Sequence, residues 1–214
     1  MKLSKALKAI IILGPPGSGK GTQAELLAES FNISHLETSK IIEANLANIT
    51  KNDFILIDKK RYRLIDEKKK REKGELMSPP LIIFLLKKRI QGLRKEGKGV
   101  ILSGSPRTLE EGKALVPFLR KLYGRKNVMV VLLELSAEES IWRNSHRRTC
   151  KLLRHSILFT KETKKLKRCP LDGSELFLRK DDSSKIIKFR LQEYQDKTFP
   201  LISLFKQQGL RIKK

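Results

Sequence analysis

Three short apolar runs stand out along the chain, and longer stretches of mixed character separate them. The runs cover residues 8–13, 99–103 and 127–135, and a glycine or a serine follows each of them. Their apolar residues are continuous rather than alternating, a pattern that is typical of strands buried on both faces. We therefore predict three strands of a parallel sheet at these positions.

Two amphipathic stretches between these runs predict helices. One follows a glycine-rich turn and the other covers residues 79–95, and in both the apolar residues recur every three or four positions, on one helix face. The two apolar stripes consist of Ala24, Leu27, Ala28 and Phe31, and of Ile82, Leu85, Leu86, Ile90 and Leu93. Alternating strands and helices predict an α/β fold with a doubly wound parallel sheet.

Residues 37–78 and 147–180 fit this alternation poorly, and we predict that they are insertions, the first helical and the second a loop or hairpin. They also contain much of the positive charge. The net charge is +24, with nine basic and three acidic side chains in residues 59–73 and ten basic and one acidic in residues 143–168. Such segments attract polyanions or form a solvated basic surface.

No apolar stretch approaches the roughly 18 residues that span a bilayer. The N-terminal residues lack the long apolar core and cleavage site of a signal peptide, so we expect a cytoplasmic protein with no membrane role. Cys150 and Cys169 are the two cysteines. They are too few for a disulfide framework, which leaves a metal site or plain thiols.

The glycine-rich turn, GPPGSGKGTQA, covers residues 14–24. Gly14, Gly19 and Lys20 have the spacing G-x-x-x-x-G-K of a phosphate loop, while Gly21 occupies the usual Ser/Thr position and Thr22 follows it. An apolar strand before the turn and an amphipathic helix after it are the context that this motif requires. Backbone N–H groups of residues 17–22 can converge on phosphate oxygens, and Lys20 neutralises their charge.

With GKGT in view, the chain resembles the adenylate kinase family of nucleoside monophosphate kinases. Further motifs in the family's order extend the resemblance almost to the C-terminus: HLETSKIIEANL (35–46), GELMSPPLI (74–82), SGSPRT (103–108), RNSHRR (143–148), CPLDGSELFLRKDD (169–182) and FRLQEYQDKTFPLI (189–202). The resemblance implies a P-loop NTPase-like, three-layer αβα core with a central parallel sheet. The core would comprise residues 1–36, 79–146 and 181–214, with a helical acceptor-binding insert at 37–78 and a lid at 147–180.

The resemblance also implies roles for individual residues in phosphoryl transfer between two nucleotides. The groups around the transferred phosphoryl would be Lys20, Arg107, Arg147, Arg179 and Arg190. The ATP-binding residues would be Gly17, Ser18, Gly19, Lys20, Gly21, Thr22, Arg143 and Arg147. The nucleoside monophosphate would contact Thr38, Glu75, Leu76, Met77, Gly104, Ser105, Pro106, Arg107, Arg179 and Arg190. Arginine suits this work because its planar fork binds phosphate oxygens in pairs and stays charged.

Several positions depart from the family pattern. Ser103 replaces an aspartate that helps to hold Mg²⁺ through water, and Lys40 and Ser105 replace an acid and a phenylalanine. Glu43 replaces an arginine that binds the acceptor phosphate. A carboxylate at this position would repel the phosphate unless its side chain points away from the site. Glu111 replaces a glutamine that reads the adenine edge. The chain also ends before the last strand of the family's sheet is expected to be complete.

Cys150, Cys169 and Asp172 resemble three positions of the zinc site in metal-bearing lids of this family. Leu153 occupies the fourth position and cannot coordinate a metal, whereas His155 offers a nitrogen two residues later. A structural zinc takes four ligands. The alternatives are a zinc site completed by His155 and a lid held by apolar contacts alone.

The resemblance implies an adenylate kinase-like enzyme that transfers the γ-phosphoryl of Mg²⁺·ATP to AMP or another nucleoside monophosphate, as a monomer, with slow or re-targeted turnover. The alternative is a nucleotide- or RNA-binding protein of the same fold, to which the charge points. Nucleic acid is the less favoured partner because aromatic residues are 6% of the chain and do not interleave with the basic runs, so stacking platforms are lacking.

Overall fold

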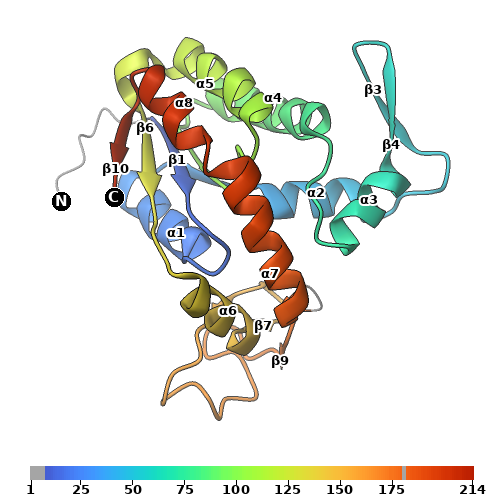
Figure 1. Ribbon diagram of the computed structural model, residues 1–214, viewed down its shortest axis with the longest axis vertical. Coiled ribbons are helices and arrows are strands. Elements are labelled where there is room, and N and C mark those ends of the chain that lie inside the picture. Colours follow the sequence, from blue (N-terminus) through green and yellow to red (C-terminus); the bar gives the residue numbers. More distant parts are fainter. Residues whose placement is uncertain (1–7, 180–181) are drawn as a thin grey trace.

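The computed structural model describes residues 8–179 and 182–214 and contains a central sheet of five strands (Figure 1). The strand order is β10-β6-β1-β5-β2, and every neighbouring pair is parallel. The strands are β1 (Ala9–Leu13), β2 (Ser34–Glu37), β5 (Val100–Ser103), β6 (Val128–Leu132) and β10 (Arg211–Lys213). The three predicted strands are confirmed, and they form the centre of the sheet. The last strand, β10, is short and pairs with β6 over three residues.

Helices cover both faces of this sheet, because successive side chains of a strand point to opposite faces. Ile11 of β1 belongs to the larger apolar cluster, whereas Ile10 and Ile12 belong to a second cluster with Ala24. The larger cluster includes residues of α4 (Pro79–Lys95), α5 (Leu109–Tyr123) and α8 (Leu201–Gln207), and the second includes α1 (Lys20–Phe31). The predicted three-layer α/β fold is confirmed.

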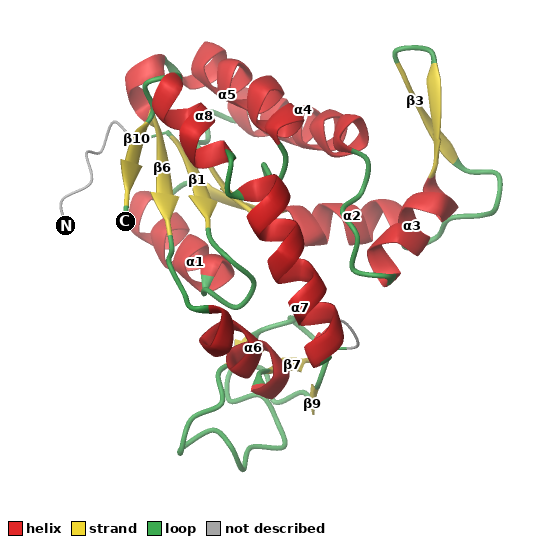
Figure 2. Ribbon diagram, in the orientation of Figure 1, coloured by secondary structure: helices red, strands yellow, loops and turns green. Residues whose placement is uncertain are grey.

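The segment between β2 and α4 contains α2 (Thr38–Leu46), β3 (Phe54–Ile57), β4 (Lys60–Arg63) and α3 (Leu64–Glu72). The predicted helical insertion has two helices, α2 and α3, and the sequence analysis did not predict its antiparallel hairpin of β3 and β4, which projects from the molecule (Figure 2). Asp58 and Lys59 make its turn with φ angles of 47° and 66°. Positive φ at both central residues gives the turn a twist that matches the two strands. Ile55, Ile57 and Tyr62 pack against the larger apolar cluster.

The segment after the 3₁₀ turn Arg125–Asn127 and β6 contains α6 (Ala137–His146), β7 (Arg148–Cys150), β8 (Ser156–Ile157) and β9 (Leu176–Phe177). β7 pairs with both β8 and β9, and long loops join these short strands. Helix α7 (Ser184–Glu193) then leads from the lid back to the core, and a π-helical turn at Tyr194–Thr198 follows it (Figure 1). Lys180 and Asp181, at the expected boundary between lid and core, lie outside the described residues. No helix among the described residues is long and apolar enough to cross a membrane.

Candidate active site

The glycine-rich turn joins the buried end of β1 to α1. Gly17 and Gly19 have φ angles of 76° and 83°, which side-chain-bearing residues rarely adopt. A Cβ at Gly17 would lie 2.4 Å from Nδ2 of Asn144. The side chain of Lys20 folds back over the turn, where its Nζ donates to the carbonyls of Gly14 (2.8 Å) and Pro15 (2.7 Å). The predicted loop geometry is therefore present, and α1 begins directly at Lys20.

Positive charge converges on Lys20 from distant parts of the chain. Burial lowers the pKa of the Lys20 ammonium well below its ordinary value, and the nearby charges of Arg107, Arg190 and Arg147 lower it further. Arg147 is held in place by Asp182, whose Oδ2 and Oδ1 accept from Nε and Nη2 at 2.8 Å each. The Asp182 side chain is only 2% exposed. A cluster of four cations in this small space is a site for a polyanion.

Two adjoining pockets meet at this cluster, beyond the carboxyl ends of β1 and β5. Both are lined by Gly74, Leu76, Gly104, Ser105, Arg107 and Arg190. The first pocket extends to Lys20 and the glycine-rich turn, and Pro106 also lines it. The second extends to Thr38, Glu75, Met77 and Arg179. In open α/β sheets, this edge is where ligands bind.

The structure thus brings together most of the residues that the sequence singled out for the acceptor. Thr38 begins α2 and lies with its Oγ1 3.4 Å from the Ser103 carbonyl. Arg143 and Arg147, which the sequence analysis assigned to ATP, line neither pocket, and Nε of Arg143 donates to Oε1 of Glu139 at 2.7 Å. The remaining predicted residues, Gly17, Ser18, Gly19, Gly21 and Thr22, form the turn and the first residues of α1.

Glu43 does not present a bare carboxylate to the second pocket. Its Oε1 accepts from Nη2 of Arg71 at 2.5 Å, so the expected repulsion of a phosphate is offset by a paired guanidinium. Arg71 lines the second pocket. The sequence did not single out Arg71, because it lies within a run of basic residues on α3 that looks like a solvated surface.

Glu111 lies in the first turn of α5 and is only 2% exposed. Its Oε2 accepts from the backbone N–H of Arg107 at 2.9 Å, while its own N–H donates to Thr108 Oγ1 at 3.2 Å. Burial raises the pKa of the Glu111 carboxyl above its ordinary value. Glu111 is also one of the residues that line the second pocket.

The hydroxyl of Ser103 at the end of β5 lies 2.6 Å from Nε2 of His35 on β2. Burial lowers the pKa of His35, which favours a neutral ring at this position. The side chain of Ser103 is therefore engaged with His35 and supplies no carboxylate at the place where the family has one.

Glu67 is a buried acid that the sequence analysis did not identify as part of the site. Its Oε2 accepts from the Ser78 N–H at 2.7 Å, and its Oε1 accepts from Ser78 Oγ at 2.6 Å and from Lys70 Nζ at 2.8 Å. Burial alone would raise the pKa of Glu67, but these hydrogen bonds from Lys70 and Ser78 lower it below its ordinary value. The contacts tie α3 to the first residue before α4 and close the segment 74–78, which lines the second pocket.

Four potential metal ligands gather in the lid segment. The ligand atoms of Cys150, His155, Cys169 and Asp172 all lie within 4.8 Å of one another. Cys150 Sγ lies 3.0 Å from Asp172 Oδ2, and His155 Nδ1 lies 3.3 Å from the same oxygen and 3.5 Å from Cys169 Sγ. Two sulfurs, one imidazole nitrogen and one carboxylate oxygen fit the preferences of a tetrahedral zinc ion. Leu153 is exposed and lies outside this group.

Comparison with known proteins gives consistent matches along the chain. The family model described as adenylate kinase matches residues 12–210. A protein of Methanothrix thermoacetophila named adenylate kinase is 35% identical over 202 residues, which cover 94% of this chain and 87% of that protein. Proteins of the same name from Caldicellulosiruptor saccharolyticus and Clostridium botulinum are 36% and 35% identical, over 95% and 94% of this chain and 89% and 88% of their own lengths.

Proposed function

The chain belongs to the adenylate kinase family and is a nucleoside monophosphate kinase of the adenylate kinase type, and we propose that its two adjoining pockets are the donor and acceptor sites. The first, next to Lys20 and the glycine-rich turn, takes the phosphates of ATP. The second, between α2, residues 74–78 and α5, takes AMP or another nucleoside monophosphate. The observation that carries this proposal is the wall that the two pockets share, which Arg107 and Arg190 line, with Lys20 beside it in the first pocket.

Phosphoryl transfer between two nucleotides needs little covalent help from a protein. It requires the donor and acceptor oxygens to be in line and the charge on the transferred group to be surrounded by cations. Arg107 and Arg190 line both pockets, so they can contact the transferred phosphoryl from either side. Arg147 is held by Asp182 and can approach the same group without reorganisation, which favours transition-state stabilisation.

On the acceptor side, we propose that Arg71 binds the α-phosphate. The pairing with Glu43 orients its guanidinium at the wall of the second pocket. Arg179 lines the same pocket and adds a further cation for the same phosphate. Thr38 and the segment Glu75–Met77 then enclose the nucleoside, and Glu111 faces its base.

ATP is proposed to bind with Mg²⁺, which is the general requirement of the family. At the end of β5, however, the hydroxyl of Ser103 is engaged with His35 and offers no carboxylate for the water molecules around such an ion. The nucleotide phosphates remain as its main ligands.

Among metal ions, zinc best suits the sulfur, nitrogen and oxygen atoms that the lid residues offer. Cys150, Cys169, Asp172 and His155 would hold it, with His155 in place of the ligand that Leu153 does not supply. A bound zinc would fix the two lid loops to each other and so stabilise the lid. Metal analysis of protein purified without added zinc tests this: about one zinc per chain supports the site, and His155→Ala should then lower the occupancy. Metal-free protein with an unchanged melting temperature on addition of zinc would contradict it.

Both pockets lie within one chain, and we propose that the enzyme acts as a monomer in the cytoplasm, where its nucleotide substrates are found. A closing lid would exclude water, which otherwise accepts the phosphoryl group.

A coupled assay of ADP formation, with Mg²⁺·ATP and each of AMP, CMP, UMP and GMP, tests the proposed sites. We expect turnover with at least one acceptor, and we expect Lys20→Ala to lower kcat/KM by at least about 100-fold, the size typical of removing one preorganised charge contact. Lys113→Ala, which removes an exposed lysine from α5, is the matched control and should leave kcat/KM unchanged. Equal activity of the two variants would refute the assignment of the donor site.

A further inference from the structure

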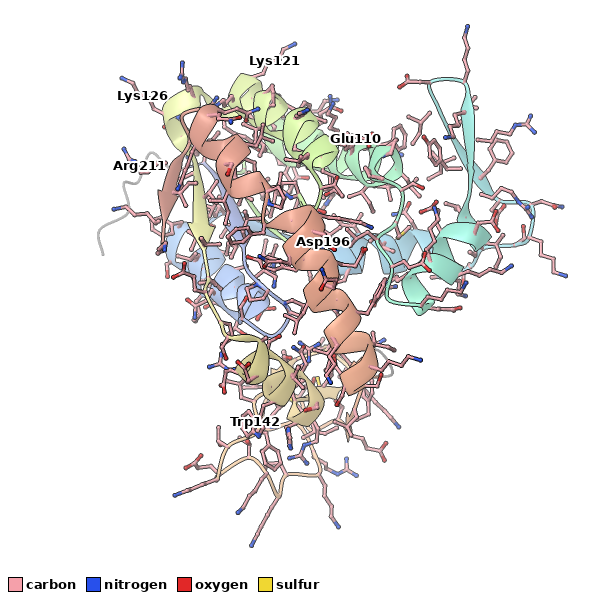
Figure 3. All side chains as sticks on the ribbon, viewed as in Figure 1. Glu110, Lys121, Lys126, Trp142, Asp196 and Arg211 are labelled. Atoms are coloured by element: carbon pink, nitrogen blue, oxygen red, sulfur yellow. The ribbon has the colours of Figure 1, made fainter. Side chains whose placement is uncertain are left out.

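Aromatic side chains gather on the lid side of α6, although they are far apart in the sequence. Trp142 stacks on His146 with 5.0 Å between ring centroids and 25° between ring planes. Phe159 completes the group, 6.3 Å from Trp142 and 5.3 Å from His146. Trp142 remains 45% exposed and lies at the edge of the molecule next to the lid loop (Figure 3). We refer to these three residues as the lid aromatic cluster.

A loop rich in lysine lies directly beside this cluster. Arg148 lies over the ring of Phe159, 5.8 Å from its centroid, and donates to the carbonyls of Thr163, Lys164 and Leu166 at 2.7–2.9 Å. These bonds fix the loop 160–168 against Phe159. Side chains that end in nitrogen project outward from this end of the molecule (Figure 3).

Four lysines of this loop are exposed, and among the described residues none of them has a carboxylate partner: Lys161, Lys164, Lys165 and Lys167. The single acid between them is Glu162, whose Oε2 accepts from Thr160 at 2.6 Å. We refer to these lysines as the lid lysine group. Neither the aromatic cluster nor the lysine group lines the donor or the acceptor pocket.

We propose that the lid aromatic cluster and the lid lysine group together form a binding surface for single-stranded nucleic acid. An exposed aromatic ring that is already stacked on one face can receive a base on the other, and a nearby group of cations binds the phosphates that link successive bases. Proteins that bind single strands without reading their sequence combine these two elements. The fold therefore supplies a stacking platform beside a basic run, because Trp142 and His146 contact Phe159 only in the folded chain.

An anionic membrane would be attracted to the same charge. Three exposed leucines, Leu152, Leu153 and Leu158, lie in the lid, so lipid is the comparison that the experiment must include. The stacked ring pair favours nucleic acid, because planar bases extend a stack while lipid chains gain nothing from the ring geometry.

The intrinsic fluorescence of the full chain gives a direct measurement, because Trp142 is its one tryptophan. A 12-nucleotide single-stranded RNA of uridines would be titrated into the protein with the donor site saturated by Mg²⁺·ATP, and the anisotropy of a label on the RNA would be followed in parallel. We expect quenching and a rise in anisotropy with the same midpoint. With four phosphate contacts, the affinity should fall about 50-fold between 50 and 200 mM salt.

Two pairs of variants locate the site. Trp142→Ala should weaken RNA binding by about 5- to 150-fold, the range for loss of one base stack. Phe54→Ala, which removes an aromatic ring that is 44% exposed on the β3–β4 hairpin, should not change it. Replacing the lid lysine group by glutamine should weaken binding and flatten the salt dependence, whereas the same change at Lys59, Lys60, Lys68 and Lys69 should have a much smaller effect.

Each of the following results would contradict the proposal. Equal losses in the two lysine variants would mean that net charge alone attracts RNA. A rise in anisotropy without quenching would place the RNA elsewhere, and displacement of RNA by ATP would place it in the donor pocket. Binding to phosphatidylserine vesicles in the absence of RNA binding would assign the surface to lipid.

Discussion

Replacing Glu67 by glutamine tests how the acceptor pocket is held together. The carboxylate of Glu67 accepts hydrogen bonds from Ser78 N–H, Ser78 Oγ and Lys70 Nζ while only 4% of the residue is exposed. Glutamine keeps the size of the side chain and one acceptor oxygen. Its NH₂ group can only donate, so it cannot accept from the Lys70 ammonium.

The structure sets the size of the expected effect. A hydrogen bond to a charged group contributes about 1.5–3 kcal/mol, and Glu67→Gln weakens at least one such bond. Lys70 is 39% exposed, so solvent screens part of its interaction, and we expect a loss of about 2 kcal/mol. For a chain of this size that lowers the melting temperature by about 4–8 °C. The matched control is Asp66→Asn, whose pair with Arg63 is 3.7 Å long and exposed on both sides and should contribute less than about 0.5 kcal/mol.

The pH dependence follows from the lowered pKa of Glu67. A carboxyl whose pKa is lower in the folded state stabilises the fold above its ordinary pKa, and this contribution is lost as the pH falls through the folded-state value. The difference in stability between the wild type and Glu67→Gln should therefore be full at pH 7 and should shrink as the pH falls below about 4.5, the ordinary value.

The assay combines thermal unfolding with steady-state kinetics. Because Glu67 closes the segment 74–78 beside the second pocket, the variant should raise KM for the nucleoside monophosphate about tenfold and leave KM for ATP within about twofold, a difference of about 1.4 kcal/mol in acceptor binding. If the variant unfolds at the same temperature as the wild type, or if both KM values rise equally, then Glu67 does not organise the acceptor pocket and the reasoning is refuted.

Three further substitutions test other contacts of the site. Arg71→Ala should raise KM for the nucleoside monophosphate at least tenfold because it removes a cation from the acceptor pocket; an unchanged KM in the coupled assay would rule out a contact with the phosphate. Asp182→Asn should lower kcat about tenfold with little change in KM, because the guanidinium of Arg147 loses its charged partner; equal losses in binding and turnover would argue against a positioning role. The pKa of the Glu111 carboxyl is raised in the folded state, so its ionisation destabilises the fold as the pH rises through the folded-state value. In thermal unfolding, Glu111→Gln should therefore gain stability over the wild type between pH 4 and pH 8. Glu110→Gln, on the exposed side of the same turn (Figure 3), should show no such trend.

The central strands could be predicted from the sequence because burial on both faces leaves a continuous apolar run. The edge strands could not. β2 (Ser34–Glu37) has one buried residue in four and β10 (Arg211–Lys213) has none, so neither carries an apolar pattern. The β3–β4 hairpin was missed because KRYR, residues 60–63, carries no apolar pattern and because Asp58-Lys59 is not a common turn pair for two positive φ angles.

The phosphate loop and most pocket-lining residues could be predicted because a fixed motif order specifies them. Glu67 and Arg71 could not, since both lie in a run of charged residues that is typical of a solvated helix. Their importance arises only when α3 packs against α2 and the start of α4, which places Glu67 under Ser78 and Arg71 beside Glu43. The four lid residues could be named from the sequence, but only the fold shows that His155, two residues from the family's position, lies with the other three.

The hydrogen bonds of Lys20 to the carbonyls of Gly14 and Pro15 would make the proposed donor site selective against uncharged compounds. A nucleoside such as adenosine has no negative charge to compete with these two carbonyl oxygens, so the side chain would keep its bonds to the turn. Only a ligand that carries negative charge can compete for the Lys20 ammonium. Binding at the loop would therefore depend on the phosphate groups of a ligand and not on its base.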